Sequence, residues 1–152
     1  MKRMVTVVFI IAVALSGILA ISCVCPPPAQ AHGLTTEERL ARVYDRFYAG
    51  LILDGTQTHT VVVGDTLANL SRQYYDNGFY YPVIMLASRE VVIDPDRIVP
   101  GMELTIPDLQ RNLDNPRARA NLKEFLLEIA LIEDDRNRPQ DAEGLRSLSA
   151  SL

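Results

Sequence analysis

Cysteine and histidine are scarce in this chain of 152 residues, which contains two of each. Both cysteines, Cys23 and Cys25, lie near the N-terminus, so the sequence downstream of them can form neither a disulfide framework nor a four-ligand zinc site. His32 follows a proline-rich stretch, His59 begins a β-favouring one, and the two support no convincing Ser-His-Asp set. We therefore predict a noncatalytic protein without a metal or a cofactor.

Clusters of basic side chains are also missing. The chain carries 15 Lys and Arg against 19 Asp and Glu, a formal net charge of −4. If residues 1–22 are removed, as proposed below, 13 basic residues remain against 19 acidic ones, a net charge of −6. Binding to a phosphate backbone needs clustered Lys and Arg, so nucleic acid is not an expected partner.

The one long apolar run lies at the front of the chain. Lys2 and Arg3 precede the apolar stretch Met4–Ile21, an arrangement typical of an export signal. Residues 19–23, Leu-Ala-Ile-Ser-Cys, resemble a lipobox, in which bacterial signal peptidase cleaves before a cysteine that receives lipid. We predict a signal peptide of the lipoprotein type over residues 1–22 and lipidation of Cys23.

Two alternatives to the lipoprotein remain open. Ala29-Gln30-Ala31 fits an ordinary signal peptidase site, and an uncut apolar run of 18 residues is just long enough to span a bilayer. In the lipoprotein interpretation, residues 23–34 form a proline-rich spacer between the membrane and a folded part. The expected location is the cell envelope, with the anchored protein facing the periplasm or the cell surface.

Two amphipathic helices are expected on either side of the middle of the chain. Thr35-Thr36-Glu37-Glu38 has the form of a capping box and begins a helix over 35–53. Asn115-Pro116 begins a second helix over 115–135. Residues 136–152 are rich in serine and charge, and we predict a disordered tail there. The apolar stripes of the two helices are Leu40, Val43, Tyr44, Phe47 and Leu51, and Leu122, Phe125, Leu126, Ile129 and Ile132.

The segment 58–107 predicts the order strand, helix, helix, strand. β-favouring residues from His59 to Val63 lead through Gly64 into a helix that Asp65 or Thr66 can cap. The second helix is expected over 79–88 and the second strand over 103–106, closed by Pro107.

The two ends of this segment resemble those of a LysM domain. Residues 59–67 read HTVVVGDTL and resemble its opening strand and Gly-Asp-Thr-Leu junction, while residues 94–107 read DPDRIVPGMELTIP and resemble its closing turn and strand. The resemblance implies a βααβ fold, so the predicted class is α+β: a small LysM domain flanked by one N-terminal and one C-terminal amphipathic helix.

Three positions depart from the usual pattern of the family. His59 stands where an aromatic residue is usual, and Tyr81 stands near a common tryptophan. Ser88 stands where many members have asparagine at the end of the second helix. The serine lacks the amide that could hold the loop 89–98, so the sequence leaves the shape of that loop in question.

The resemblance also implies a ligand. LysM domains typically bind glycans that contain N-acetylglucosamine, such as peptidoglycan or chitin, in a shallow groove between the first strand-helix loop and the loop before the second strand. In that groove Leu67, Ile93 and Pro95 could form an apolar floor. The alternative is architectural, because turns and caps explain every motif residue. Carried over by position, the glycan-binding residues are Gly64, Asp65, Thr66, Leu67, Ile93, Asp94, Pro95, Asp96, Arg97 and Ile98.

These observations predict a noncatalytic cell-envelope protein that binds peptidoglycan and tethers the membrane to the wall. The alternative is an envelope adaptor whose LysM fold is structural and whose flanking helices bind a protein partner or a second copy. A further aromatic cluster could stack on sugars, although helical spacing favours the core for Tyr74 and Tyr81. The cluster is Tyr74, Tyr75, Phe79, Tyr80 and Tyr81.

Overall fold

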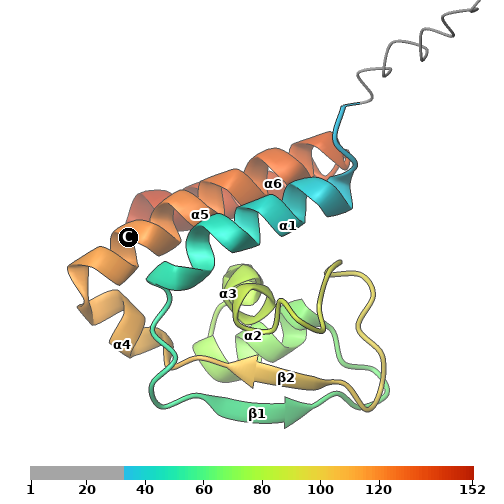
Figure 1. Ribbon diagram of the computed structural model, residues 1–152, viewed down its shortest axis with the longest axis vertical. Helices are drawn as coiled ribbons and strands as arrows, with labels where there is room; N and C mark the ends of the chain where they lie inside the picture. Colours follow the sequence, from blue (N-terminus) through green and yellow to red (C-terminus); the bar gives the residue numbers. More distant parts are fainter. Residues whose placement is uncertain (1–32) are drawn as a thin grey trace, which may run out of the picture. The chain divides into compact units, whose positions relative to one another are not determined.

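The computed structural model describes residues 33–152, which form one compact unit (Figure 1). The predicted signal peptide, Cys23 and nearly all of the predicted spacer lie outside the described residues. Within the described part, no helix combines the length and the apolarity needed to cross a membrane.

Six α-helices, two short 3-10 turns and two strands make up this unit, and the βααβ order over its middle confirms the predicted α+β class. The elements are α1 Thr36–Phe47, η1 Tyr48–Gly50, β1 Gln57–Thr60, α2 Leu67–Tyr75, η2 Gly78–Tyr80, α3 Tyr81–Ala87, β2 Glu103–Ile106, α4 Leu109–Asp114, α5 Pro116–Asp135 and α6 Pro139–Ser151.

The sheet consists of β1 and β2 in antiparallel pairing, with Gln57 opposite Ile106 at one end and Thr60 opposite Glu103 at the other. β1 ends at Thr60, earlier than the predicted Val63, although the Val61 amide still donates to the Met102 carbonyl at 2.8 Å. Both long loops of the βααβ unit therefore leave the sheet at its Thr60–Glu103 end. α2 and α3 lie between the sheet and a layer of α1, α5 and α6 (Figure 1).

A single hydrophobic core joins the βααβ unit to its flanking helices. Phe125 of α5 is fully buried, and its ring lies 5.6 Å from that of Phe47 and 6.4 Å from that of Tyr44, both on α1. The apolar stripes of the two flanking helices thus pack on each other and on the domain, which enlarges a core that about 50 residues alone would leave small.

The prediction of a disordered tail over 136–152 is wrong. After α5, Asn137 adopts a left-handed conformation with φ 60°, and the chain returns along α5 as α6. Leu145 is fully buried, Leu148 nearly so, and the Ser149 hydroxyl donates to the Lys123 carbonyl at 3.0 Å. The spacing of these leucines indicated a helix face. A short amphipathic segment is marginal alone, so α6 is stable because its apolar face packs on α5.

Two further differences concern the connections. The first helix ends at Phe47 and continues as η1, so it is shorter than the predicted 35–53. The short helix α4 was not predicted. Its buried Asn112 accepts from the Ile52 amide at 2.8 Å and donates to the Ile52 carbonyl at 2.9 Å, which ties α4 to the segment before β1.

Candidate functional site

The two loops of the βααβ unit enclose a small cavity, which we call the two-loop cleft. Its volume is about 140 Å³. Thr66 and Leu67 come from the first loop and the start of α2, and Pro95 and Asp96 come from the loop before β2. The full lining is Thr66, Leu67, Ala68, Tyr81, Pro95, Asp96, Arg138 and Asp141.

The first loop is fixed by local hydrogen bonds. Gly64 has φ 97°, a conformation that favours glycine, and the Asp65 amide donates to the Val62 carbonyl at 3.1 Å. Thr66 caps α2 by accepting from the Asn69 amide at 3.1 Å. Of the two residues predicted to cap α2, Thr66 does so. The Asp65 carboxylate makes other hydrogen bonds.

The Asp65 carboxylate connects the first loop to the sheet. One of its oxygens accepts from the Val62 amide at 2.9 Å and lies 2.9 Å from Nε2 of His59, whose Nδ1 lies 3.1 Å from the Tyr74 hydroxyl. The Val62 amide, and then His59, hold the pKa of Asp65 below its ordinary value. His59, which replaces the usual aromatic residue, thus supports the loop by hydrogen bonds.

Substitution of Asp65 should change how stability depends on pH. A carboxyl whose pKa is lower in the folded than in the unfolded protein stabilises the fold above its unfolded pKa of about 3.9, and this contribution is lost as the pH falls through the folded value. We expect Asp65→Asn to lower the melting temperature at neutral pH, and the difference from the wild type to shrink as the pH falls from about 5 to about 2. Thermal melting across this pH range measures it, and a difference independent of pH would contradict the role of the charge.

The second loop is held by arginines from the turn between α5 and α6. Arg136 donates to Asp94 at 2.6 Å and to Asp96 at 3.2 Å, and Arg138 donates to both oxygens of Asp96 at 3.0 Å. Burial alone would raise the pKa of Asp94, but the hydrogen bond from Arg136 and the bond from the Asp96 amide keep it below its usual value. Asp94 and Asp96, two of the three carboxylates predicted to bind glycan, are thus paired with arginines in this structure.

A buried carboxylate lies behind these arginines. Glu133 on α5 is 1% exposed, and its oxygens lie 2.5 Å from Nε of Arg138 and 3.5 Å from Nη1 of Arg136. The Tyr81 hydroxyl lies 3.3 Å from the same carboxylate. The result is an ion-pair network that runs from the core to the second loop, and it takes both of its cations from outside the βααβ unit.

The structure brings only part of the predicted site together. Thr66, Leu67, Pro95 and Asp96 line the two-loop cleft. Ile93, expected in the apolar floor, instead lines a different cavity beside α1. The remaining predicted residues do not line the cleft: Gly64 and Asp65 shape the first loop, Asp94 and Arg97 take part in ion pairs, and Ile98 packs against the core.

Four residues of the cleft were not among the predicted glycan-binding residues: Ala68, Tyr81, Arg138 and Asp141. Arg138 and Asp141 lie at the start of α6, in the stretch predicted to be disordered. The signal that could have found them was the pair of arginines beside Pro139, a residue common in the first turn of a helix.

Ser88, which stands where many LysM domains have asparagine, anchors the second loop. Its hydroxyl accepts from the Thr105 amide at 2.9 Å and lies 3.3 Å from the Thr105 carbonyl, while its backbone carbonyl accepts from the Val91 and Val92 amides at 2.9 and 2.8 Å. The side chain is buried. The serine therefore fastens the start of the second loop directly to β2.

Loss of this hydroxyl should destabilise the fold moderately. Ser88→Ala leaves the part-buried backbone amide of Thr105 without its side-chain partner, which we expect to lower the free energy of unfolding by about 1–2 kcal/mol. Urea denaturation measures the change. Ser71→Ala is a matched control for loss of a buried serine, because the Ser71 hydroxyl bonds to the Asn77 carbonyl, outside the second loop. Faster proteolysis of residues 89–98 in the Ser88 variant only would show that the effect includes this loop.

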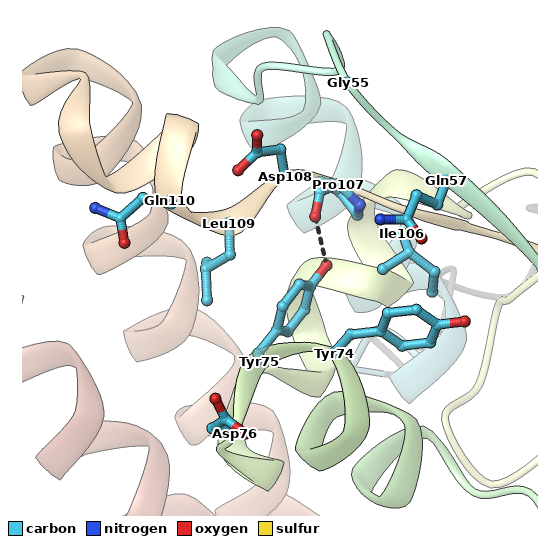
Figure 2. A pocket seen from close by; sticks show the side chains of 10 residues that line it. All are labelled: Gly55, Gln57, Tyr74, Tyr75, Asp76, Ile106, Pro107, Asp108, Leu109 and Gln110. Atoms are coloured by element: carbon cyan, nitrogen blue, oxygen red, sulfur yellow. Dashed lines mark hydrogen bonds between the residues drawn. The ribbon is translucent and has the colours of Figure 1, made fainter.

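A larger hollow of about 340 Å³ lies at the Gln57–Ile106 end of the sheet, away from both loops (Figure 2). The Tyr75 hydroxyl donates to the Pro107 carbonyl at 3.0 Å, and burial raises the pKa of Tyr75. This side chain thus joins α2 to the end of β2. The hollow is lined by Gly55, Gln57, Tyr74, Tyr75, Asp76, Ile106, Pro107, Asp108, Leu109 and Gln110.

The βααβ unit also has a match among known domain families. Residues 59–107 match the LysM domain family, which confirms the resemblance seen in the sequence. The chain is also similar to the potassium binding protein Kbp of Escherichia coli O6:H1, with 36% identity over 69 residues that cover 45% of this chain and 46% of that protein. The match thus spans less than half of the relative's length. No solved structure matches the chain.

Proposed function

We propose that this protein is a noncatalytic component of the cell envelope that binds N-acetylglucosamine-containing glycan, peptidoglycan in the first place, through its LysM domain. The observation that carries the proposal is the two-loop cleft, in which Thr66 and Leu67 face Pro95 and Asp96 across a hollow. Turn amides and carbonyls there can bond to hydroxyl and N-acetyl groups, while Leu67 and Pro95 offer apolar contact to a sugar face.

The state of the second loop supports this proposal. A binding loop that is already held in one conformation loses less conformational entropy when it meets a ligand. Here Asp94 and Asp96 are held by Arg136 and Arg138, and Ser88 fastens the same loop to β2. The second loop is thus preorganised in part by two arginines that lie outside the segment matched to the family.

The direct test is cosedimentation of the full chain, in mild detergent, with purified peptidoglycan sacculi. The wild type should pellet with the sacculi, whereas Ala68→Gln should lose most of the bound fraction, because Ala68 lines the cleft and a longer side chain would fill it. Ala120→Gln is the matched control, since Ala120 is an exposed helical alanine on α5. Wild-type protein that stays in the supernatant at every salt concentration would contradict the proposed glycan binding.

The membrane connection is proposed from the sequence, because Cys23 lies outside the described residues. A diacylated Cys23 with an amide-linked third chain would anchor the protein stably, and glycan binding by the LysM domain would then tether that membrane to the wall. Incorporation of labelled palmitate should occur in the wild type and disappear in Cys23→Ser. Label that persists in the variant would contradict lipidation at this residue.

The adaptor alternative finds one supporting observation on α5. Leu127 and Leu131, four residues apart on one helix face, are 41% and 51% exposed. A protein that fails to bind sacculi but self-associates or captures an envelope partner through this face would fit the alternative. Substitution of both leucines by glutamine should then abolish that association.

A further inference from the structure

A second cavity adjoins the two-loop cleft, and we call it the side trough. The two cavities share Ala68, Tyr81 and Asp141. From this junction the side trough follows α2 away from the loops through Arg72 to Asp76. These positions are spaced by four residues, so they lie along one face of the helix.

Helix α6 contributes to the other side of the side trough. Asp141 lies in the first turn of α6, and Gly144 follows it by three residues, one turn further along. A Cβ atom at Gly144 would lie 2.2 Å from ring atoms of Phe79, so only glycine admits the ring at this place on the α6 backbone. Phe79 is still 37% exposed and lines the side trough. The absence of a side chain at Gly144 therefore positions an accessible aromatic ring in the cavity.

The polar groups of the side trough fit a neutral sugar. Arg72 supplies guanidinium donors and forms no ion pair within residues 33–152, while Asn77 supplies an amide. Asp76 and Asp141 supply acceptors, and Asp141 also pairs with Arg138 at 3.9 Å. The lining of the side trough itself thus carries two carboxylates and one guanidinium, which disfavours an anionic ligand. A few polar groups beside an exposed aromatic ring suit a polyhydroxylated, uncharged ligand.

The volumes of the two cavities indicate that one ligand would occupy both. The two-loop cleft measures about 140 Å³, below the range of roughly 300–1,000 Å³ that is usual for ligand pockets. The side trough measures about 340 Å³ and opens from the same three shared residues. A polymeric ligand that occupies the cleft would meet the adjoining side trough next.

We propose that the side trough is a further glycan subsite, which binds the sugar units that adjoin the one held in the two-loop cleft. Its ligand class is a neutral N-acetylated glycan chain. The inference rests on the proposed glycan binding and adds α6, outside the family-matched segment, as a wall of the site. Glycan affinity should therefore increase with chain length in this protein.

The test compares chitobiose with chitohexaose by calorimetric titration of the full chain in detergent. We expect the wild type to bind the longer oligomer about tenfold more tightly. Phe79→Leu removes the ring face and Arg72→Met removes the guanidinium while both keep an apolar side chain. Each should reduce the ratio of the two affinities to about twofold or less and leave chitobiose binding unchanged. Arg117→Met, at an exposed position on α5, should retain the full ratio.

The outcomes separate this inference from the function on which it rests. If the wild type binds neither oligomer and does not pellet with sacculi, the proposed function fails and the subsite with it. If the wild type binds both oligomers but the Phe79 and Arg72 variants keep its ratio, the side trough is not a subsite and the two-loop cleft stands alone. Melting curves show whether Phe79→Leu is folded, and the Arg72 variant decides the question independently of core packing.

Discussion

Glu133→Gln is expected to lower the free energy of unfolding by about 3 kcal/mol, because it removes the one buried carboxylate of residues 33–152, which lies beside two partly buried arginines. Breaking a buried ion pair from one side costs roughly 3–5 kcal/mol, since the remaining charge stays desolvated without a partner. The lower end applies here because Arg136 and Arg138 keep bonds to Asp94 and Asp96. Urea denaturation of both proteins at neutral pH measures the difference.

Glu124→Gln is the matched control for this prediction. Glu124 lies on the same helix, its side chain is 66% exposed, and it pairs with Arg46 at 3.6 Å. An exposed ion pair contributes about 0–1 kcal/mol, so this variant should unfold close to the wild type. Equal effects of the two substitutions would contradict the view that Glu133 neutralises a buried network. The Glu133 variant should also expose the second loop to proteases, because both arginines that hold it lose their inner partner.

Phe125→Ala is expected to cost about 3–5 kcal/mol, the usual range for removal of a fully buried phenylalanine ring. The ring packs against Tyr44 and Phe47 of α1. Its loss would leave a cavity between α5 and α1 that the two helices cannot close without shifting. Equilibrium unfolding in urea measures the loss, and the slope of the transition reports whether α1 has come away as well.

Leu127→Ala on the same helix provides the comparison. Leu127 is 41% exposed, so truncation should cost under about 1 kcal/mol. A Phe125 variant as stable as the Leu127 variant would show that the flanking helices do not share the core of the LysM domain. A LysM domain that remains folded after α1 and α5 have unfolded would lead to the same conclusion.

Both predictions concern the connection between the LysM domain and its flanking helices. Asp94 and Asp96 belong to the matched segment 59–107, but their partners Arg136 and Arg138 lie beyond it. In this protein the second loop of the LysM domain is thus held partly from outside the domain. The flanking helices influence the proposed glycan site through ion pairs as well as through the core.

Elements whose hydrogen bonds are local could be predicted from the residue types alone. The capping box at Thr35 and Glu38, the cap at Thr66 and the cap at Asn115 all close within three residues, so their residue types are sufficient to specify them. The two motifs of the βααβ unit are local in the same sense. For this reason the fold class and the LysM resemblance were predicted and are confirmed.

Packing between distant segments determines which loop residues face the two-loop cleft and what holds them. Arg136 reaches Asp94 and Asp96 across 42 and 40 residues of sequence, and no local pattern encodes such a pair. The weak leucine pattern of α6 became a helix face only because α5 buries it. A surface charge can pair with any of several partners, and a short amphipathic segment is marginal in isolation, so packing selected both the helix and the ion pairs.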